Sequence, residues 1–189
     1  NGGSVGKILS IDFCWSYNIA KNNNFTWRHD PDMVGKNIMM IGAQYENLMR
    51  IFGPAINVTA FSNLVRPSLR DQIGRTKIST IPDHAEIIAE METGAVLHMR
   101  LSGIIGMSYP CEMWIFATNG TIRCVLNPPA TVTSSGIWVG YQNQNRLTDV
   151  PIRYPLGDKH QTEIEFIESI RGNCQARETT FENGVRYME

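Results

Sequence analysis

The sequence predicts an α+β domain built on one large, mainly antiparallel β-sheet with helices on one face. Two observations support this. Segments typical of strands follow one another through the middle of the chain without alternating with helices, and two hairpins can be placed in register from their side-chain alternation. The length of 189 residues, with 42% hydrophobic and 19% charged residues, fits a single globular domain.

Composition excludes several classes of partner. Seventeen basic residues against 18 acidic ones leave a net charge of −1, so nucleic acid is not an expected partner. No apolar run reaches the roughly 20 residues that span a bilayer, so no membrane partner is expected either. The cysteines show no CxxC spacing, which argues against a zinc or redox pair, and we expect small buried hydrophobes in a cytoplasmic protein. They are Cys14, Cys111, Cys124 and Cys174.

The first third of the chain predicts a strand, a loop and a helix. The strand covers residues 5–19, with Leu9, Ile11, Phe13 and Trp15 on one face. After a polar loop over residues 21–31, a helix is expected with Asp32 as its N-cap and with Gly53-Pro54 as its end. Its apolar stripe recurs at spacings of three and four, at Ile38, Ile41, Tyr45, Leu48 and Phe52.

Residues 55–157 read as β-structure, with strands expected over 57–65 and 78–81 before the first hairpin. That hairpin turns at Glu92-Thr93-Gly94. Its register places eight apolar residues on one face, whereas a slip by one residue would mix the faces. The expected pairs are Met91 with Ala95, Ala89 with Leu97, Ile87 with Met99 and Ala85 with Leu101, while Glu86 meets Arg100 on the other face.

The second hairpin is expected to turn at Asn119-Gly120, a two-residue primed turn. This register pairs Ala117 with Ile122, Ile115 with Cys124 and Met113 with Leu126, and it places Trp114, Phe116, Arg123 and Val125 on the opposite face. Bulky apolar groups thus occupy both faces, yet only three helices can be read in the chain. We therefore expect a homodimer through the open sheet face, with Trp114, Phe116 and Val125 in the contact.

The last part of the chain predicts two strands and two helices. Residues 137–141 and 150–154 read as strands. Asp158 is the expected N-cap of a helix that ends at Gly172. Thr180 is the expected N-cap of a final helix. The apolar stripes of these helices are Ile164, Ile167 and Ile170, and then Phe181, Val185 and Met188.

The sequence lacks the usual enzyme fingerprints. There is no GxGxxG turn, no GxxxxGK[ST] loop, no GxSxG elbow and no HExxH helix. The histidines show no ligand spacing and are expected to be structural or surface groups. They are His29, His84, His98 and His160. The chain is therefore expected to hold no metal and no nucleotide cofactor by itself.

The order of the elements resembles a known family. Trp27-Arg28-His29-Asp30-Pro31 to Gly35, followed by Met40-Ile41-Gly42 and Leu48-Met49-Arg50-Ile51-Phe52-Gly53, resembles the start of the C-terminal domain of the Gfo/Idh/MocA oxidoreductases. These are relatives of glucose–fructose oxidoreductase and inositol dehydrogenase. Asp83-His84-Ala85-Glu86, Asn119-Gly120-Thr121 and Phe181-Glu182-Asn183-Gly184 are similar to later parts of the same domain.

The resemblance implies a function for residues 1–189 as one substrate-binding and oligomerisation domain. An N-terminal Rossmann domain, which would hold NAD or NADP, is not in this chain. The substrate would be a sugar-like or polyol-like small molecule, and the isolated domain would be inactive. Alternatives are a non-catalytic pseudo-enzyme that binds or dimerises, and a free-standing β-rich carbohydrate-binding domain.

The site departs from the family pattern. The family helix often reads Asp-Ile-Gly-x-His-x-x-Asp, and the resemblance places Gln44 at the catalytic His and Met40 and Asn47 at the two carboxylates. These three positions share one helix face. A carboxamide cannot titrate, so Gln44 either orients a substrate oxygen or packs in a cleft between domains. The candidate substrate-binding residues are Gln44, Asn47, Met40, Trp27 and Arg28. Arg28 and Lys36 near the helix start are placed either to meet an anion or to lie in solvent.

Overall fold

A computed structural model describes residues 5–16, 23–35, 38–104, 111–126, 135–151, 161–175 and 180–188. An eight-stranded sheet has the order β10-β9-β8-β7-β1-β6-β5-β2, and β3 and β4 form a separate hairpin. The strands are β1 (Ile8–Ser16), β2 (Ala55–Asn63), β3 (Ser68–Arg70), β4 (Thr76–Ile78), β5 (His84–Met91), β6 (Val96–Ser102), β7 (Cys111–Ala117), β8 (Gly120–Leu126), β9 (Gly136–Tyr141) and β10 (Thr148–Val150). The helices are η2 (Trp27–His29), α1 (Pro31–Val34), η3 (Ile38–Met40), α2 (Ile41–Phe52), α3 (Gln161–Ile170) and α4 (Phe181–Met188), of which η2 and η3 are 3₁₀ helices.

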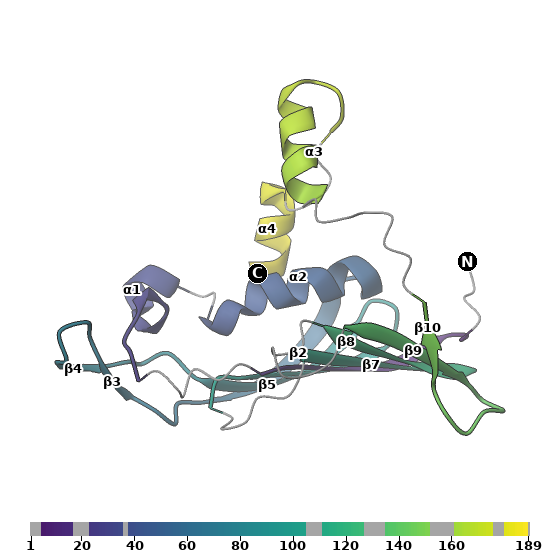
Figure 1. Cartoon of the computed structure of the whole chain (residues 1–189), viewed down its shortest axis with the longest axis horizontal. Helices are drawn as coiled ribbons and strands as arrows, with labels where there is room; N and C mark the ends of the chain where they lie inside the picture. The colour runs from purple at the N-terminus through teal and green to yellow at the C-terminus, as the bar shows by residue number, and fades with distance from the viewer. Residues whose placement is uncertain are drawn as a thin grey trace.

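The helices lie on one side of the large sheet and leave its other face open (Figure 1). Only β1 and β6 pair in parallel among the described strands, and every other pairing is antiparallel. The predicted fold class is therefore confirmed. No helix in the described ranges is long and apolar enough to cross a membrane.

The β5–β6 hairpin has the predicted register. Ala85 lies opposite Leu101, Ile87 opposite Met99 and Ala89 opposite Leu97, with Glu86 facing Arg100. The Met91 amide donates to the Ala95 carbonyl at 2.8 Å. The eight apolar residues of these pairs are all buried, so the alternation of the sequence fixes which face of both strands meets the helices.

The first strand carries a bulge that the sequence did not reveal. The pairing of β1 with β7 shifts between Ile8 and Ser10. Leu9 is therefore turned away from the core and is 49% exposed, while Ile8 packs against the core beside buried Ile11 and Phe13. The expectation that Leu9 shares the apolar face was wrong, because one extra residue in a strand reverses the alternation that follows it.

The β7–β8 hairpin differs from its predicted register by two residues. Ala117 pairs with Gly120, Ile115 with Ile122, Met113 with Cys124 and Cys111 with Leu126, so the turn is Thr118-Asn119. Gly120 is not among the residues with positive φ, which excludes the primed turn. A shift of two residues keeps every side chain on its predicted face, so Trp114, Phe116 and Arg123 still lie on the open face.

Neighbouring segments explain this shift. The amides of Thr118 and Asn119 donate to the carbonyls of Lys7 and Val5 at 2.9 and 2.8 Å, which fixes the turn against the chain before β1. A Cβ atom on Gly120 would lie 2.6 Å from the Gly140 carbonyl oxygen. Glycine is therefore required at this position for the close approach of β9 rather than for a turn.

The single helix expected from Asp32 is broken into shorter pieces. Asp30, not Asp32, caps α1, and its side chain accepts a hydrogen bond from the Asp32 amide at 3.0 Å. Pro31 occupies the first turn, where its missing N–H has no cost. Met39 and Met40 both adopt left-handed backbone angles before α2 begins. The predicted end is confirmed, because Gly53 closes α2 at φ 81°.

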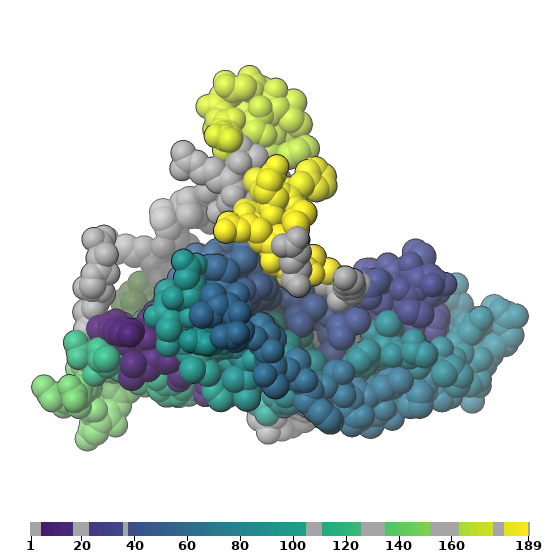
Figure 2. Space-filling model, turned by 180° about the vertical axis from the view of Figure 1, so that it is seen from behind, coloured from purple at the N-terminus to yellow at the C-terminus, as the bar shows by residue number. Residues whose placement is uncertain are grey.

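The core lies between α2 and the centre of the sheet. Leu48 and Phe52 of α2 are 2% and 3% exposed within the cluster formed with β1, β5, β6, β7 and β8. In Figure 2, α4 rests on α2 and α3 projects away from the sheet. A Cβ atom on Gly42 would lie 2.8 Å from the Met188 sulfur and 3.0 Å from the Tyr187 ring, so glycine allows α4 to approach α2.

The C-terminal helices match the sequence only in part. Thr180 caps α4, because its hydroxyl accepts from the Asn183 amide at 3.2 Å. The predicted apolar stripes of these two helices are largely exposed among the described residues. The side chain of Phe181 is 92% exposed and that of Ile170 is 70% exposed. The predicted cap Asp158 and most of the predicted 150–154 strand lie outside the described residues.

The cysteines are free but not all buried. Cys111 and Cys124 are buried, Cys14 is half-buried and Cys174 is exposed, so the expectation of a buried thiol was wrong for Cys174. Burial raises the pKa of Cys111 to about 12, with Cys14 and Glu112 adding to the effect. A thiol with so high a pKa is almost entirely protonated at neutral pH and is a poor nucleophile.

The contact between β8 and β9 leads to a stability prediction. Replacing Gly120 by Ala places a methyl group against the Gly140 carbonyl oxygen, and backbone must move to admit it. We expect Gly120→Ala to lower the free energy of unfolding by about 1–3 kcal/mol in denaturant titrations.

Gly184→Ala in α4 is the matched control. A Cβ atom there meets only the Tyr187 hydroxyl at 3.8 Å, and alanine favours a helix over glycine by about 1 kcal/mol. The control should therefore be neutral or stabilising. Equal stability of Gly120→Ala and the parent would show that β9 does not approach β8 this closely.

Candidate functional site

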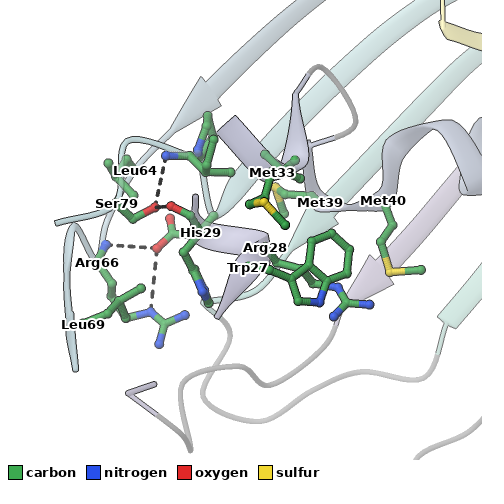
Figure 3. A pocket seen from close by; sticks show the side chains of 14 residues that line it. Trp27, Arg28, His29, Met33, Met39, Met40, Leu64, Arg66, Leu69 and Ser79 are labelled. Atoms are coloured by element: carbon green, nitrogen blue, oxygen red, sulfur yellow. Dashed lines mark hydrogen bonds and ion pairs between the residues drawn. The ribbon is translucent and has the colours of Figure 1, made fainter. Parts of the chain in front are cut away.

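A cavity of about 200 Å³ lies beside the start of α2 (Figure 3). One wall comes from the segment that precedes α2, and the other from the chain between β2 and β5. The first wall includes Trp27, Arg28, His29, Met33, Met39 and Met40. The second includes Leu64, Arg66, Leu69, Ser79 and Asp83.

The five residues proposed from the sequence do not all lie in this cavity. Trp27, Arg28 and Met40 line it, whereas Gln44 and Asn47 lie further along α2. Gln44 is only 7% exposed, and the hydrogen bonds of the described residues include none from its side chain. Asn47 is exposed and donates through Nδ2 to the Ala43 carbonyl at 3.1 Å, within its own helix.

Strained backbone brings the two methionines into the cavity wall. Met39 has φ 52° and ψ 22°, and Met40 has φ 60° and ψ 30°. Left-handed angles cost a residue with a Cβ atom about 1–2 kcal/mol. Burial of Met39, which is 7% exposed, helps to hold this turn in place. Consecutive strained residues beside a cavity are a feature of ligand sites more than of ordinary helix starts.

Trp27 and Arg28 form a stacked pair in the same wall of the cavity. The guanidinium carbon of Arg28 lies 4.2 Å from the centroid of the Trp27 ring. Such a contact orients the cation without neutralising it. No carboxylate in the described parts of the chain forms an ion pair with Arg28.

The Asp83 carboxylate stabilises the second wall through hydrogen bonds and an ion pair. Its Oδ1 accepts from the Val65 amide at 2.8 Å and its Oδ2 from the Arg66 amide at 2.9 Å. The Arg66 Nε atom lies 3.7 Å from Oδ2, and its Nη2 donates to the Gly103 carbonyl at 3.3 Å. The carboxylate is therefore used in holding the chain after β2 to the start of β5, and it is not free to act as a base.

His29 is held in one tautomer at the back of the first wall. The Thr26 amide donates to Nδ1 at 3.0 Å, so in the neutral ring the hydrogen is on Nε2. Burial is the largest cause of the lowered pKa of His29, and the guanidinium groups of Arg66 and Arg28 also lower it. The contact with the Thr26 backbone and the Asp83 carboxylate oppose this shift. The imidazole is thus a neutral hydrogen-bond donor at pH 7.

Three residues of this cavity are not predicted from the sequence. The sequence predicts a structural or surface role for His29, and its position directly after Trp27-Arg28 is the one signal of its place in the cavity. Arg66 and Asp83 meet only because β2 and β5 are neighbours in the sheet. The spacing of Arg66 and Asp83 along the chain does not predict that contact.

The open face carries a second cluster, formed by Glu112, Trp114, Arg123 and Trp138. Arg123 Nη2 lies 2.7 Å from Glu112 Oε1, and Trp114 Nε1 donates to Glu112 Oε2 at 3.0 Å. The Arg123 guanidinium lies 5.3 Å from the ring centroids of both Trp114 and Trp138. Phe116 stacks beside Trp114 at 6.2 Å, and Val125 is already buried within the single chain at 4% exposure.

Metal binding finds no support in the described residues. No group of three or more His, Cys, Asp or Glu side chains in those ranges is placed to hold an ion.

Comparison with known proteins identifies the family. The model of the GFO/IDH/MocA C-terminal domain matches residues 1–123. The chain belongs to this family. A search of curated proteins gave no significant match.

Solved structures share the fold of this GFO/IDH/MocA domain at low sequence identity. Levoglucosan dehydrogenase in complex with NADH and L-sorbose superimposes with a TM-score of 0.78 at 15% identity, covering 98% of this chain and 55% of that one. An NAD binding oxidoreductase from Klebsiella pneumoniae gives 0.75 at 14% identity, with coverages of 98% and 55%. A putative NADPH-dependent oxidoreductase from Desulfitobacterium hafniense gives 0.73 at 16% identity, with coverages of 97% and 52%. The chain thus spans about 55% of the length of the first of these.

The strained turn of this GFO/IDH/MocA domain gives a direct test. Met40→Gly and Met40→Ala both remove the side chain, which is 40% exposed, but only glycine adopts φ 60° without strain. We expect Met40→Gly to be more stable than Met40→Ala by about 1 kcal/mol in thermal or chemical unfolding. If the alanine variant is equally or more stable, residue 40 does not hold the left-handed conformation.

Proposed function

We propose that this chain is the substrate-side and dimerisation domain of an NAD(P)-dependent oxidoreductase that acts on a sugar-like or polyol-like substrate. The observation that carries the proposal is the cavity beside α2, because it gathers Trp27, Arg28 and Met40 in a fold shared with nicotinamide-dependent oxidoreductases. A Trp side chain, methionines and a few polar donors make a small concave site suited to a polyhydroxylated ligand.

The residues present do not fit the dinucleotide itself. No GxGxxG turn follows a strand anywhere in the sequence, and such a turn supplies the close backbone approach and the helix N-terminus that bind a pyrophosphate. NAD or NADP would therefore be bound by another part of a longer polypeptide, and the isolated chain would be inactive. What this chain contributes is binding and orientation of the substrate.

A second candidate function is a pseudo-enzyme. Oxidation of an alcohol requires a group that accepts the hydroxyl proton, and Gln44 cannot do so. Met40 and Asn47 do not titrate either, and the His29 Nδ1 atom already accepts the Thr26 amide. A domain that binds and dimerises without catalysis is consistent with this set of residues.

Dimerisation through the open sheet face is the structural half of the proposal. No helix covers that face in the described part of the chain (Figure 1). Trp114 and Phe116 stack there with nearly parallel rings, at an interplanar angle of 9°. Aromatic surface of this kind is favourable to bury against a second copy.

Turnover by the full-length protein tests the enzymatic proposal. We expect reduction of NAD or NADP with at least one member of a sugar and polyol panel, and no turnover by the 189-residue chain alone. Trp27→Ala should raise KM by about tenfold, because it removes a wall of the cavity. Phe61→Ala, which truncates an aromatic that is 66% exposed and does not line the cavity, should leave KM unchanged. Bound cofactor without turnover of any substrate would favour the pseudo-enzyme.

The dimer is tested by a charge on the open face. Trp114→Glu should leave the core intact, since Trp114 points away from it, and should convert a dimer to a folded monomer in light scattering. Ile51→Glu on α2, at a site that is 62% exposed, is the control and should remain dimeric. A parent protein that is monomeric at high concentration, or a Trp114→Glu variant that still dimerises, would show that another surface is used.

A further inference from the structure

We propose that the cavity beside α2 selects an anionic ligand, a small polyol that carries a carboxylate, and that Arg28 pairs with this carboxylate. The inference rests on the proposed function, because it names the substrate class of the same cavity. It is carried by the charges of the cavity wall, by Arg28, which forms no ion pair among the described residues, and by the size of the space.

The cavity wall holds more positive than negative charge. Its ionisable side chains are Arg28, His29, Arg66 and Asp83, and His29 is neutral at pH 7. The cavity wall therefore carries two positive guanidinium groups and one negative carboxylate. That carboxylate already accepts two backbone amides, and its ion pair with Arg66 is long at 3.7 Å. The buried Nε atom of Arg66 has no hydrogen-bond partner, so the compensation of its charge is incomplete.

Arg28 is the cation available to a ligand. The nearest carboxylates in sequence are Asp30 and Asp32, and the Asp30 side chain instead accepts from the Asp32 amide. The Trp27 ring holds the guanidinium group at 4.2 Å. An arginine oriented on an aromatic ring keeps N–H donors that match a carboxylate in bidentate geometry.

His29 provides a second hydrogen-bond donor in the cavity wall. Figure 3 shows its ring between the side chain of Arg66 and the Trp27–Arg28 pair. Because Nδ1 accepts the Thr26 amide, Nε2–H remains for an acceptor. Burial is the main cause of the lowered pKa of His29, and the guanidinium groups of Arg66 and Arg28 lower it further against the opposing Asp83 carboxylate.

The size and lining of the space favour a small ligand with an apolar side. Its volume of about 200 Å³ is below the roughly 300–1,000 Å³ that is typical of sites for drug-sized ligands. Met33, Met39 and Leu69 add apolar surface to the wall, against which the C–H face of a sugar chain can pack. Arg66 is already held by Asp83 and by the Gly103 carbonyl, and Arg28 forms no ion pair among the described residues. One guanidinium group therefore remains for the ligand, and it can hold a single carboxylate in bidentate geometry.

Calorimetry on the full-length protein tests this assignment with three probes of similar chain length. D-Gluconate carries the carboxylate, D-glucitol is its neutral counterpart, and D-glucitol 6-phosphate carries the alternative anion. We expect gluconate to bind at least about tenfold more tightly than glucitol and more tightly than the phosphate.

Variants connect the preference to Arg28. Arg28→Gln should remove the preference for gluconate, a loss of about tenfold, and should leave the affinity for glucitol nearly unchanged. Arg28→Lys should retain part of the preference, because the charge remains without the bidentate geometry. Arg186→Gln on α4, an exposed arginine with no ion pair among the described residues, is the matched control and should behave as the parent.

The possible outcomes separate this inference from the proposed function. Equal affinities for gluconate and glucitol, failure of gluconate to bind, tighter binding of the phosphate, or gluconate binding that survives Arg28→Gln would each overturn the inference. Turnover of neutral polyols alone would overturn it and leave the proposed function standing. Binding of gluconate that depends on Arg28, without nicotinamide turnover of any substrate, would support the inference and overturn the proposed enzymatic function.

Discussion

The parallel pairing of β1 with β6 holds the two halves of the sheet together. On one side of this pair lie β5 and β2, and on the other lie β7, β8, β9 and β10. Phe13 lies opposite Met99 and Ile11 opposite Leu97, and all four side chains are buried in the core. The first strand of the domain thus occupies the middle of the sheet, and the rest of the chain must pass around it.

This placement also assembles the cavity. The segment that starts at Asn23 lies against β3, where the Phe25 amide donates to the Arg70 carbonyl at 2.6 Å and the Arg70 amide to the Asn23 carbonyl at 2.8 Å. Those bonds attach the Trp27 segment to β3, and the Ser79 hydroxyl secures it again by donating to the His29 carbonyl at 3.0 Å. The left-handed turn at residues 39–40 then directs the chain into α2 over the core. The energetic cost of that turn is offset by burial of the helix that follows.

An element could be predicted from the sequence where residues close to it along the chain determine its structure. Alternation along β5 and β6, with a turn of fixed length, determined a register in which Glu86 faces Arg100. The predicted β7–β8 turn was wrong because the prediction assumed that Gly120 adopts a turn conformation open only to glycine. Glycine is instead required there because the Gly140 backbone of β9 lies too close for a side chain. The start of the first helix was misplaced because Asp30 and Asp32 both satisfy the pattern of a cap, and only the position of Pro31 separates them. In the site, the family resemblance pointed to Trp27, Arg28 and Met40, but the contact of Arg66 with Asp83 depends on strand order and could not be read from one sequence.

The central claim is that the cavity beside α2, with Arg28 at its wall, is where a ligand binds. A crystal structure of the full-length protein with NADH and gluconate tests this most directly. The account predicts that the gluconate carboxylate lies within hydrogen-bonding distance of the Arg28 guanidinium group, with its carbon chain against Trp27 and Met40. Gluconate bound elsewhere, with this cavity filled only by solvent, would contradict it.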